Sequence, residues 1–119
     1  MKTKNGLITR PDGSKAWYLN GKLYREDGGP TVEYPDGTKE WYLNGKLHRE
    51  DGPAVEYSNG SKAWWLKGKR HRIDGPACEH SNGSKEFWYN NKEYDKMSYY
   101  NLMVKKGHIT KTQAFVEMI

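Results

Sequence analysis

Apolar and polar positions recur along the chain with a period of 23 or 24 residues. Residues 11–34 (PDGSKAWYLNGKLYREDGGPTVEY), 35–57 and 58–80 are three copies of one pattern, residues 81–94 begin a fourth, and residues 7–10 match the last strand of a copy. Short runs rich in Trp, Tyr, Val and Leu, typical of β-strands, alternate with Asp-Gly or Asn-Gly pairs, typical of tight hairpin turns. The pattern predicts two antiparallel strands in every repeat.

The two turns of each copy set the predicted register. If both are two-residue type I′ loops, Trp41 lies opposite Val32, and His48 lies opposite Trp41. The better candidate for the core is then the face that contains this Trp and its equivalents. In one copy this face carries Val32, Tyr34, Trp41, Leu43 and His48. Its aromatic column through the copies is Trp17, Trp41, Trp64 and Phe87.

The opposite predicted face mixes apolar and charged side chains. In one copy it carries Glu33, Glu40, Tyr42, Leu47 and Arg49. A second aromatic column follows it through all the copies, and we expect this column to be the exposed one. Its members are Tyr18, Tyr42, Trp65 and Trp88.

After the last repeat the pattern changes to one typical of short helices. Asp95 is a candidate N-cap and Gly107 a stop signal for a first helix, and Thr110 and Gln113 have the spacing of a capping box for a second. We expect both helices to cover the last hairpin, because an open sheet edge invites association. The expected apolar side of the second helix comprises Ala114, Phe115, Met118 and Ile119.

These elements predict a mostly β protein, an elongated single-layer antiparallel meander of β-hairpin repeats with a short C-terminal helical cap. The chain of 119 residues is expected to form a single domain, 1–119, with the repeats in 7–94 and the cap in 95–119. About eight or nine strands, at roughly 4.8 Å each, would extend about 40 Å.

Composition changes this picture in two respects. Hydrophobic residues make up 34% of the chain and mean hydropathy is −1.09, so the five Trp and nine Tyr must supply much of the core. No apolar run approaches the roughly 20 residues of a membrane span, and the N-terminal stretch 1–10 lacks the apolar segment of a signal peptide. A single cysteine, Cys78, fits a reducing compartment. The expected location is the cytoplasm.

The repeat resembles the MORN family over most of the chain, residues 7–94. The resemblance is carried by Asn44-Gly45-Lys46, His48, Tyr57 and Ser58-Asn59-Gly60-Ser61, with their equivalents in the other copies. Where the family has glycine after the histidine, this chain has Arg25, Arg49 and Arg72. It is therefore similar to the variant repeat N-G-K-x-H-R-E-D-G-P-A of small bacteriophage and bacterial proteins. This resemblance implies a scaffold without catalytic residues. A phage protein of this kind would inhibit or redirect a host protein, in the host cytoplasm.

Three sets of residues could carry chemistry, and a structural role is favoured for each. The repeated His-Arg-x-Asp-Gly-Pro unit could serve acid–base catalysis, but catalysis needs one preorganised constellation rather than a periodic one. We expect its Arg to pair with an Asp of a neighbouring copy. Cys78 replaces Val32 and Val55 of the other copies, and His48 and His71 lack the spacing of zinc ligands. No enzyme activity, metal or cofactor is predicted.

Two binding functions remain, with a small anionic ligand or a lipid headgroup as a third. The first is capture of a protein partner, because Trp, Tyr and Arg are enriched at interface hot spots. The second is binding of single-stranded nucleic acid, since 20 basic residues face 15 acidic ones and the pI is about 9.2. Equivalent rings about 10 Å apart do not match bases about 3.4 Å apart. The oligomeric state stays open. The partner-binding residues predicted are Tyr18, Tyr42, Trp65, Trp88, Leu47, Arg49, Arg70 and Arg72.

Overall fold

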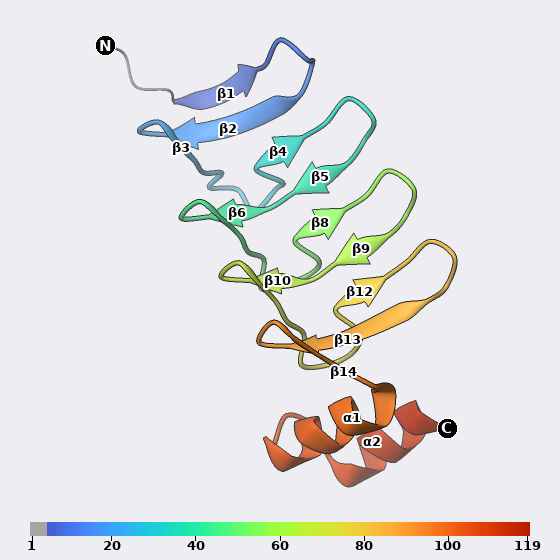
Figure 1. Cartoon of the computed structure of the whole chain (residues 1–119). Coiled ribbons are helices and arrows are strands. Elements are labelled where there is room, and N and C mark those ends of the chain that lie inside the picture. The colour runs from blue at the N-terminus through green and yellow to red at the C-terminus, as the bar shows by residue number, and fades with distance from the viewer. Residues whose placement is uncertain (1–4) are drawn as a thin grey trace.

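Short antiparallel strands follow one another along the long axis of the molecule in chain order, and two helices close the C-terminal end (Figure 1). This computed structural model describes residues 5–119, so residues 1–4 of the expected domain lie outside the described part. The extents are 55 × 28 × 22 Å. The predicted fold class, a mostly β elongated meander with a helical cap, is confirmed.

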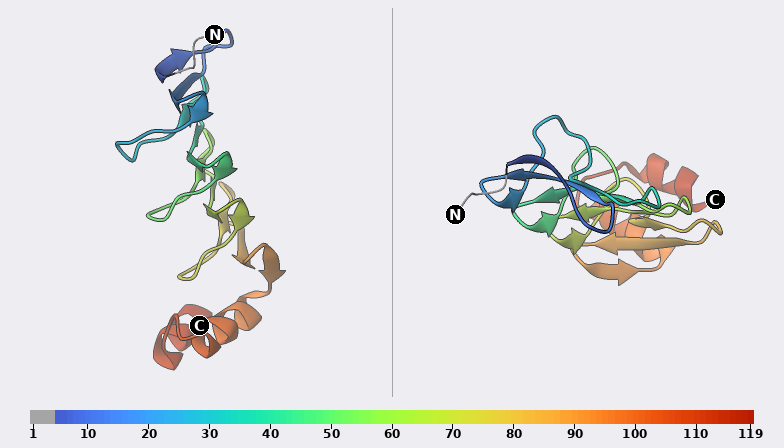
Figure 2. Two further views of the ribbon diagram at one scale, coloured as in Figure 1. Left: turned by 90° about the vertical axis from the view of Figure 1, so that its left-hand side faces the viewer. Right: turned by 90° about the horizontal axis from the view of Figure 1, so that it is seen from above.

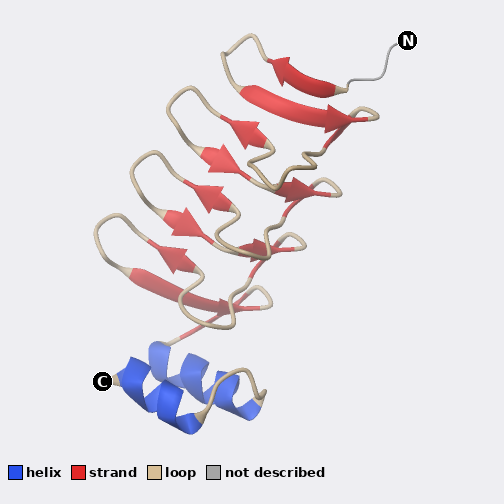
Figure 3. Ribbon diagram, turned by 180° about the vertical axis from the view of Figure 1, so that it is seen from behind, coloured by secondary structure: helices blue, strands red, loops and turns tan. Residues whose placement is uncertain are grey.

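The described residues form fourteen short strands and two helices (Figure 3). The main sheet has the order β1-β2-β4-β5-β8-β9-β12-β13-β14, with β3 paired to β2, while β6-β7 and β10-β11 form two-stranded hairpins. The bounds are β1 Gly6–Thr9, β2 Lys15–Leu19, β3 Lys22–Leu23, β4 Val32–Glu33, β5 Lys39–Glu40, β6 Tyr42–Leu43, β7 Lys46–Leu47, β8 Val55–Glu56, β9 Lys62–Ala63, β10 Trp65–Leu66, β11 Lys69–Arg70, β12 Cys78–Glu79, β13 Lys85–Tyr89, β14 Lys92–Tyr94, α1 Lys96–Lys105 and α2 Lys111–Met118.

The strand number exceeds the predicted eight or nine for two reasons. A loop divides each of three predicted strands, giving β3 and β4, β7 and β8, and β11 and β12. Two further strands change partners halfway, giving β5 and β6, and β9 and β10. At Trp41 the backbone N–H donates to Ala54 O at 2.8 Å, and the carbonyl accepts from His48 N at 2.9 Å. Trp64 does the same with Ala77 and His71. One half of each long strand therefore pairs inside the main sheet, and the other half forms a separate hairpin.

The first turn of each copy has three residues, not the predicted two. Val32 pairs with Glu40, so Tyr34 lies opposite Thr38, and the loop is 35–37. Gly37 donates its N–H to Tyr34 O at 3.0 Å and has φ 95°, a left-handed conformation that favours glycine. The predicted opposition of Trp41 and Val32 is wrong by one residue.

The second turn is the predicted two-residue type I′ loop. Asn44 and Gly45 have φ values of 52° and 76°, positive at both central positions as this turn requires. Leu43 pairs with Lys46, and His48 N–H bonds to Trp41 O, so the predicted opposition of His48 and Trp41 is confirmed.

The one-residue error exchanges half of the side chains between the two faces, because successive strand residues point to opposite sides. Val32 and Tyr34 lie with Glu40 and Tyr42 on the side that we call the open face. Glu33 lies with Trp41 on the other side, which we call the loop face. The predicted core face that combined Val32 with Trp41 is therefore wrong.

Three loops project from the loop face, one from each of the first three copies (Figure 2). They connect β3 to β4, β7 to β8 and β11 to β12, and we call them loop 1 (24–31), loop 2 (48–54) and loop 3 (71–77). Across the strands of the main sheet, lysine and glutamate alternate at directly opposed positions. Opposite charges in this register disfavour a shifted pairing of the strands. This ladder runs Lys15, Glu33, Lys39, Glu56, Lys62, Glu79 and Lys85.

The two helices form the cap and contain one of the two cores. Asp95 accepts a hydrogen bond from Ser98 N at 2.8 Å, and Thr110 and Gln113 form the capping box, so both predicted helix starts are confirmed. Tyr99, Tyr100 and Met103 of α1 pack with Phe87 and Ala114. Phe115 and Ile119 were predicted on the same side but are exposed, because Ala114 and Met118, four residues apart, are the ones that meet this core.

Candidate functional site

An aromatic row crosses the open face, at right angles to the strands. Trp65 and Trp88 are half-buried and pack, with Leu47, against the second core cluster of Val55, Ala63 and Cys78. The loops project from the opposite side, and the helices lie at the end of the sheet (Figures 1 and 2). Trp65, predicted in the exposed column, is therefore only partly exposed, because its ring covers this cluster on one side and faces solvent on the other. The row consists of Tyr18, Tyr42, Trp65 and Trp88.

Arg70 lies between the two tryptophans of the aromatic row. Its guanidinium carbon is 5.2 Å from the ring centroid of Trp65 and 5.0 Å from that of Trp88, within the range of cation–π attraction. Nη1 is 3.8 Å from Oε1 of Glu86, which also accepts a 3.0 Å hydrogen bond from Trp88 Nε1. These contacts hold the guanidinium beside both rings of the row, with its charge partly balanced.

The tyrosine half of the row is held by different polar partners. Tyr42 and Tyr34 both donate their hydroxyl groups to Oε1 of Glu40, at 3.0 and 2.6 Å. Burial, followed by the charge of Glu40, raises the pKa of Tyr42 to about 12, so its phenol keeps its proton at neutral pH. Tyr18 accepts a 3.0 Å bond from Arg10.

One polar atom of the row is left without a partner. Nε1 of Trp65 is buried, and no described residue accepts its hydrogen. Glu86 accepts from Trp88 two residues along the same strand, but Ala63 occupies the equivalent position before Trp65. Aligning the copies would have revealed this difference, because glutamate alternates with alanine at this position.

The sequence predicts Arg49 and Arg72 on the same face as the aromatic row, and this prediction is wrong. The guanidinium of Arg49 lies 3.9 Å above the ring of Trp41 on the loop face, and Arg72 has the same position on Trp64. Arg49 Nε donates to Asp51 at 2.8 Å. The expected pairing with Asp of a neighbouring copy is therefore wrong, since the partner belongs to the same loop.

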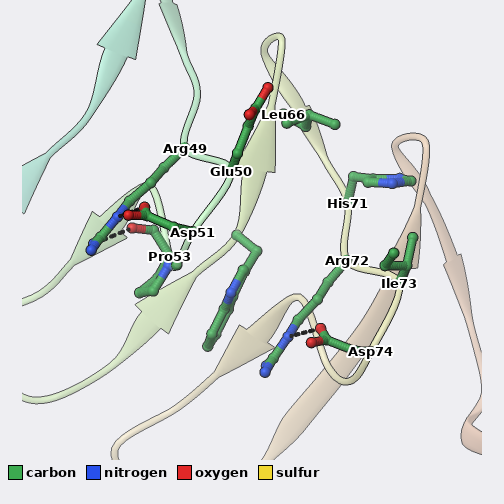
Figure 4. A pocket seen from close by; sticks show the side chains of 11 residues that line it. Arg49, Glu50, Asp51, Pro53, Leu66, His71, Arg72, Ile73 and Asp74 are labelled. Atoms are coloured by element: carbon green, nitrogen blue, oxygen red, sulfur yellow. Dashed lines mark hydrogen bonds and ion pairs between the residues drawn. The ribbon is translucent and has the colours of Figure 1, made fainter. Parts of the chain in front are cut away.

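The space between loops 2 and 3 is a groove of about 690 Å³ (Figure 4). Its lining combines the Trp64 ring and Leu66 with Pro53 of loop 2 and Ile73 of loop 3. Sequence analysis missed this groove. The available signal was Ile73, which occupies the position of Glu26 and Glu50 in the earlier copies and leaves 41% of its surface exposed.

The histidines of the repeat support neighbouring hairpins. Nδ1 of His48 accepts from Lys67 N at 2.9 Å, and Nδ1 of His71 accepts from Asn90 N at 3.0 Å. Lys67 and Asn90 have positive φ, so each histidine stabilises the strained first residue of the next turn. Burial, with a smaller contribution from His108, lowers the pKa of His71.

Cys78 is buried beside Val55 and Ala63, which confirms its predicted place as a small apolar strand residue. Desolvation raises the pKa of its thiol, which disfavours the reactive thiolate. Among residues 5–119, no group of three or more His, Cys, Asp and Glu side chains is arranged to hold a metal ion.

Comparison of the chain with family models, curated proteins and solved structures gives no match. Within the described residues, neither helix has the length and apolar character to cross a membrane. The MORN-like resemblance stays a prediction from the repeat pattern, and function has to be argued from the geometry of the two faces.

Proposed function

We propose that the chain is a non-catalytic repeat scaffold that binds a protein partner through the aromatic row of its open face. The observation that carries this proposal is Arg70 held between Trp65 and Trp88 on a face that no loop crosses. Aromatic rings and arginine concentrate binding energy at interfaces because they bury large areas at a low entropy cost. The resemblance to phage and bacterial repeats implies a bacterial host protein as the partner.

Rigidity favours the same function. Main-chain pairing, the lysine–glutamate ladder and the stacked loops hold the row in one conformation before any partner arrives. A preorganised surface loses little conformational freedom on binding, so more of its contact energy appears as affinity.

Nucleic acid is the alternative, and the charges of the open face count against it. Glu86 lies beside Arg70 and Trp88, and Glu40 lies beside Tyr42, so two of the four rings have a carboxylate next to them. A single-strand groove would instead present a continuous positive track along its stacking platforms. The lysines beside the two-residue turns pair with the strand residue that follows each ring of the row, so they face the other side of the sheet. They are Lys22, Lys46, Lys69 and Lys92.

The test is affinity capture from a bacterial lysate with the immobilised chain, compared with its Arg70→Ser and Lys69→Ser variants. Both variants lose one positive charge. Lys69 is the control because it is the neighbouring residue of the same hairpin but faces the other side of the sheet. We expect a protein retained by the wild type and by Lys69→Ser to be lost from Arg70→Ser, with thermal unfolding showing that all three chains are folded.

Titration of labelled single-stranded DNA and RNA at low and moderate salt separates the alternative. Binding to phosphates releases counterions, so its affinity falls steeply as salt rises. Salt-sensitive binding that both variants weaken equally, without any protein captured, would contradict the proposal.

A further inference from the structure

Loop 3 holds a tyrosine hydroxyl supplied by the helical cap. The hydroxyl of Tyr99 donates to the carbonyl of Arg72 and accepts from Gly75 N at 3.3 Å. Its ring lies 5.1 Å from the ring of Phe87, and the side chain is completely buried. One carbonyl and one N–H on the same loop thus form a site for a group that both donates and accepts a hydrogen bond.

Loop 2 carries the same two backbone groups at the same positions of the repeat. The equivalents of Arg72 O and Gly75 N are Arg49 O and Gly52 N, and no described residue bonds to either. The loops are otherwise held alike, since Arg49 bonds to Asp51 and Pro53 O as Arg72 bonds to Asp74 and Pro76 O. Loop 2 therefore has the hydroxyl site without a hydroxyl.

This site opens into the groove between loops 2 and 3. Arg49 and Gly52 both line the groove. Trp64 has the place beside loop 2 that Phe87 has beside loop 3, because Arg49 N donates to Trp65 O as Arg72 N donates to Trp88 O. Loop 1 differs, because the extra Gly29 lengthens it and Nε1 of Trp41 already donates to Gly28 O at 3.1 Å. No described residue accepts from Nε1 of Trp64.

Three carboxylates lie on the rim of the groove. The side chains of Glu50, Asp51 and Asp74 line it and leave 82%, 83% and 75% of their surface exposed. Asp51 and Asp74 are paired with Arg49 and Arg72, so Glu50 is the carboxylate of the rim that no described arginine balances. Its charge favours a partner that carries positive charge next to the inserted group. The segment that fills loop 3 has this character, since α1 contains Lys96 and Lys105 as well as Tyr99.

We propose that the groove between loops 2 and 3 binds a tyrosine side chain from a basic segment of a partner protein, as loop 3 binds Tyr99. The phenol hydroxyl would bond to Arg49 O and Gly52 N, and the ring would lie against Trp64, Leu66 and Pro53. The groove is on the opposite side of the sheet from the aromatic row. Binding in the groove is therefore independent of whether the row binds a protein.

The test uses the ¹⁵N-labelled full chain and a capped peptide with the sequence of residues 95–106, DKMSYYNLMVKK, followed by NMR. We expect saturable shifts of the Gly52 amide and the Trp64 indole N–H. The matched peptide with Phe in place of the tyrosine at position 99 should bind more weakly, by roughly 2- to 12-fold for each of the two hydrogen bonds that it loses.

Two protein variants test the role of Glu50 on the rim with equal changes in net charge. Glu50→Lys should weaken the affinity for the peptide by roughly two- to fivefold, the range of an exposed charge pair. Glu26→Lys, at the equivalent position of loop 1, should leave the affinity unchanged. Equal binding of the Tyr and Phe peptides, shifts confined to Trp65 and Trp88 on the open face, or no shifts at millimolar peptide would each overturn the proposal.

Discussion

At the scale of single residues, stability depends on tryptophan rings that are each covered by an arginine side chain. Trp17, Trp41 and Trp64 each have a guanidinium 3.9 Å above the ring, and in every case the arginine belongs to the loop of the same copy. The ring supplies buried area, and the arginine anchors the loop through Asp and a proline carbonyl. A chain with few aliphatic residues obtains its cohesion in this way.

Replacement of Trp41 with Ala should therefore destabilise the fold by roughly 3–5 kcal/mol. The side chain leaves only 9% of its surface exposed, and its loss would remove the support of Arg49 and the bond to Gly28 O. Chemical denaturation of both chains measures the difference in the free energy of unfolding. Tyr24→Ala is the control, because that ring is exposed and should cost much less.

His71 should make stability depend on pH. Burial lowers its pKa in the folded chain below the ordinary value of 6.5, so the unfolded chain takes up the proton first as pH falls. Its contribution is fully present above about pH 6.5 and is lost progressively at lower pH. The unfolding free energy should fall from pH 7.5 to 5.5, and fall less in His71→Gln. An equal fall in both chains would show that other groups are responsible.

At the scale of elements, the two hairpin turns of a copy use different geometries, and each needs a particular residue. The three-residue turn places Gly37 at φ 95°, whereas the two-residue turn places Asn44 at φ 52°, a conformation that asparagine tolerates. The turn length, in turn, decides which face each following side chain joins.

Gly37→Ala should destabilise the chain by about 1–2 kcal/mol, because the left-handed backbone crowds a Cβ atom. No atom lies within 4 Å of the position that this Cβ would take, so the cost comes from the backbone and not from a clash. Asn44→Gly, which relaxes a positive-φ residue in the other turn, should change stability by much less. Thermal unfolding of the two variants measures both effects, and similar values would contradict the assignment of the turns.

At the scale of the whole molecule, the helical cap takes the place of a further repeat. Phe87 has no following loop to supply an arginine, and Tyr99 and Tyr100 cover its ring instead, at 5.1 and 5.5 Å. In stacked repeats each unit is stabilised by its neighbours, so the end of the stack needs a cover of its own.

A chain that ends at Tyr94 should be less stable and should associate. It would expose Phe87 and the last hairpin, and it would lose the hydroxyl that joins Tyr99 to loop 3. Size-exclusion chromatography with light scattering should show oligomers at concentrations where the full chain elutes at a smaller mass. A truncated chain with the mass and melting temperature of the full chain would contradict this role of the cap.

The sequence by itself determined the repeats, the antiparallel pairing, the type I′ turns and both helix starts. Each of these depends on a few neighbouring residues, such as Asn44-Gly45 or Thr110 with Gln113, whose local chemistry suffices. The aromatic composition likewise predicted a core of rings, as Trp41, Phe87 and Tyr99 confirm.

Only the tertiary structure decided which side chains share a face. An Asp-Gly pair is compatible with loops of two or three residues, and one residue of difference moved Val32 to the open face and Glu33 to the loop face. The place of Arg49 on Trp41 was decided by how loop 2 folds back on the sheet. The groove between loops 2 and 3 has the same origin. Its lining residues come from two copies, so the pattern of a single repeat does not predict that they meet.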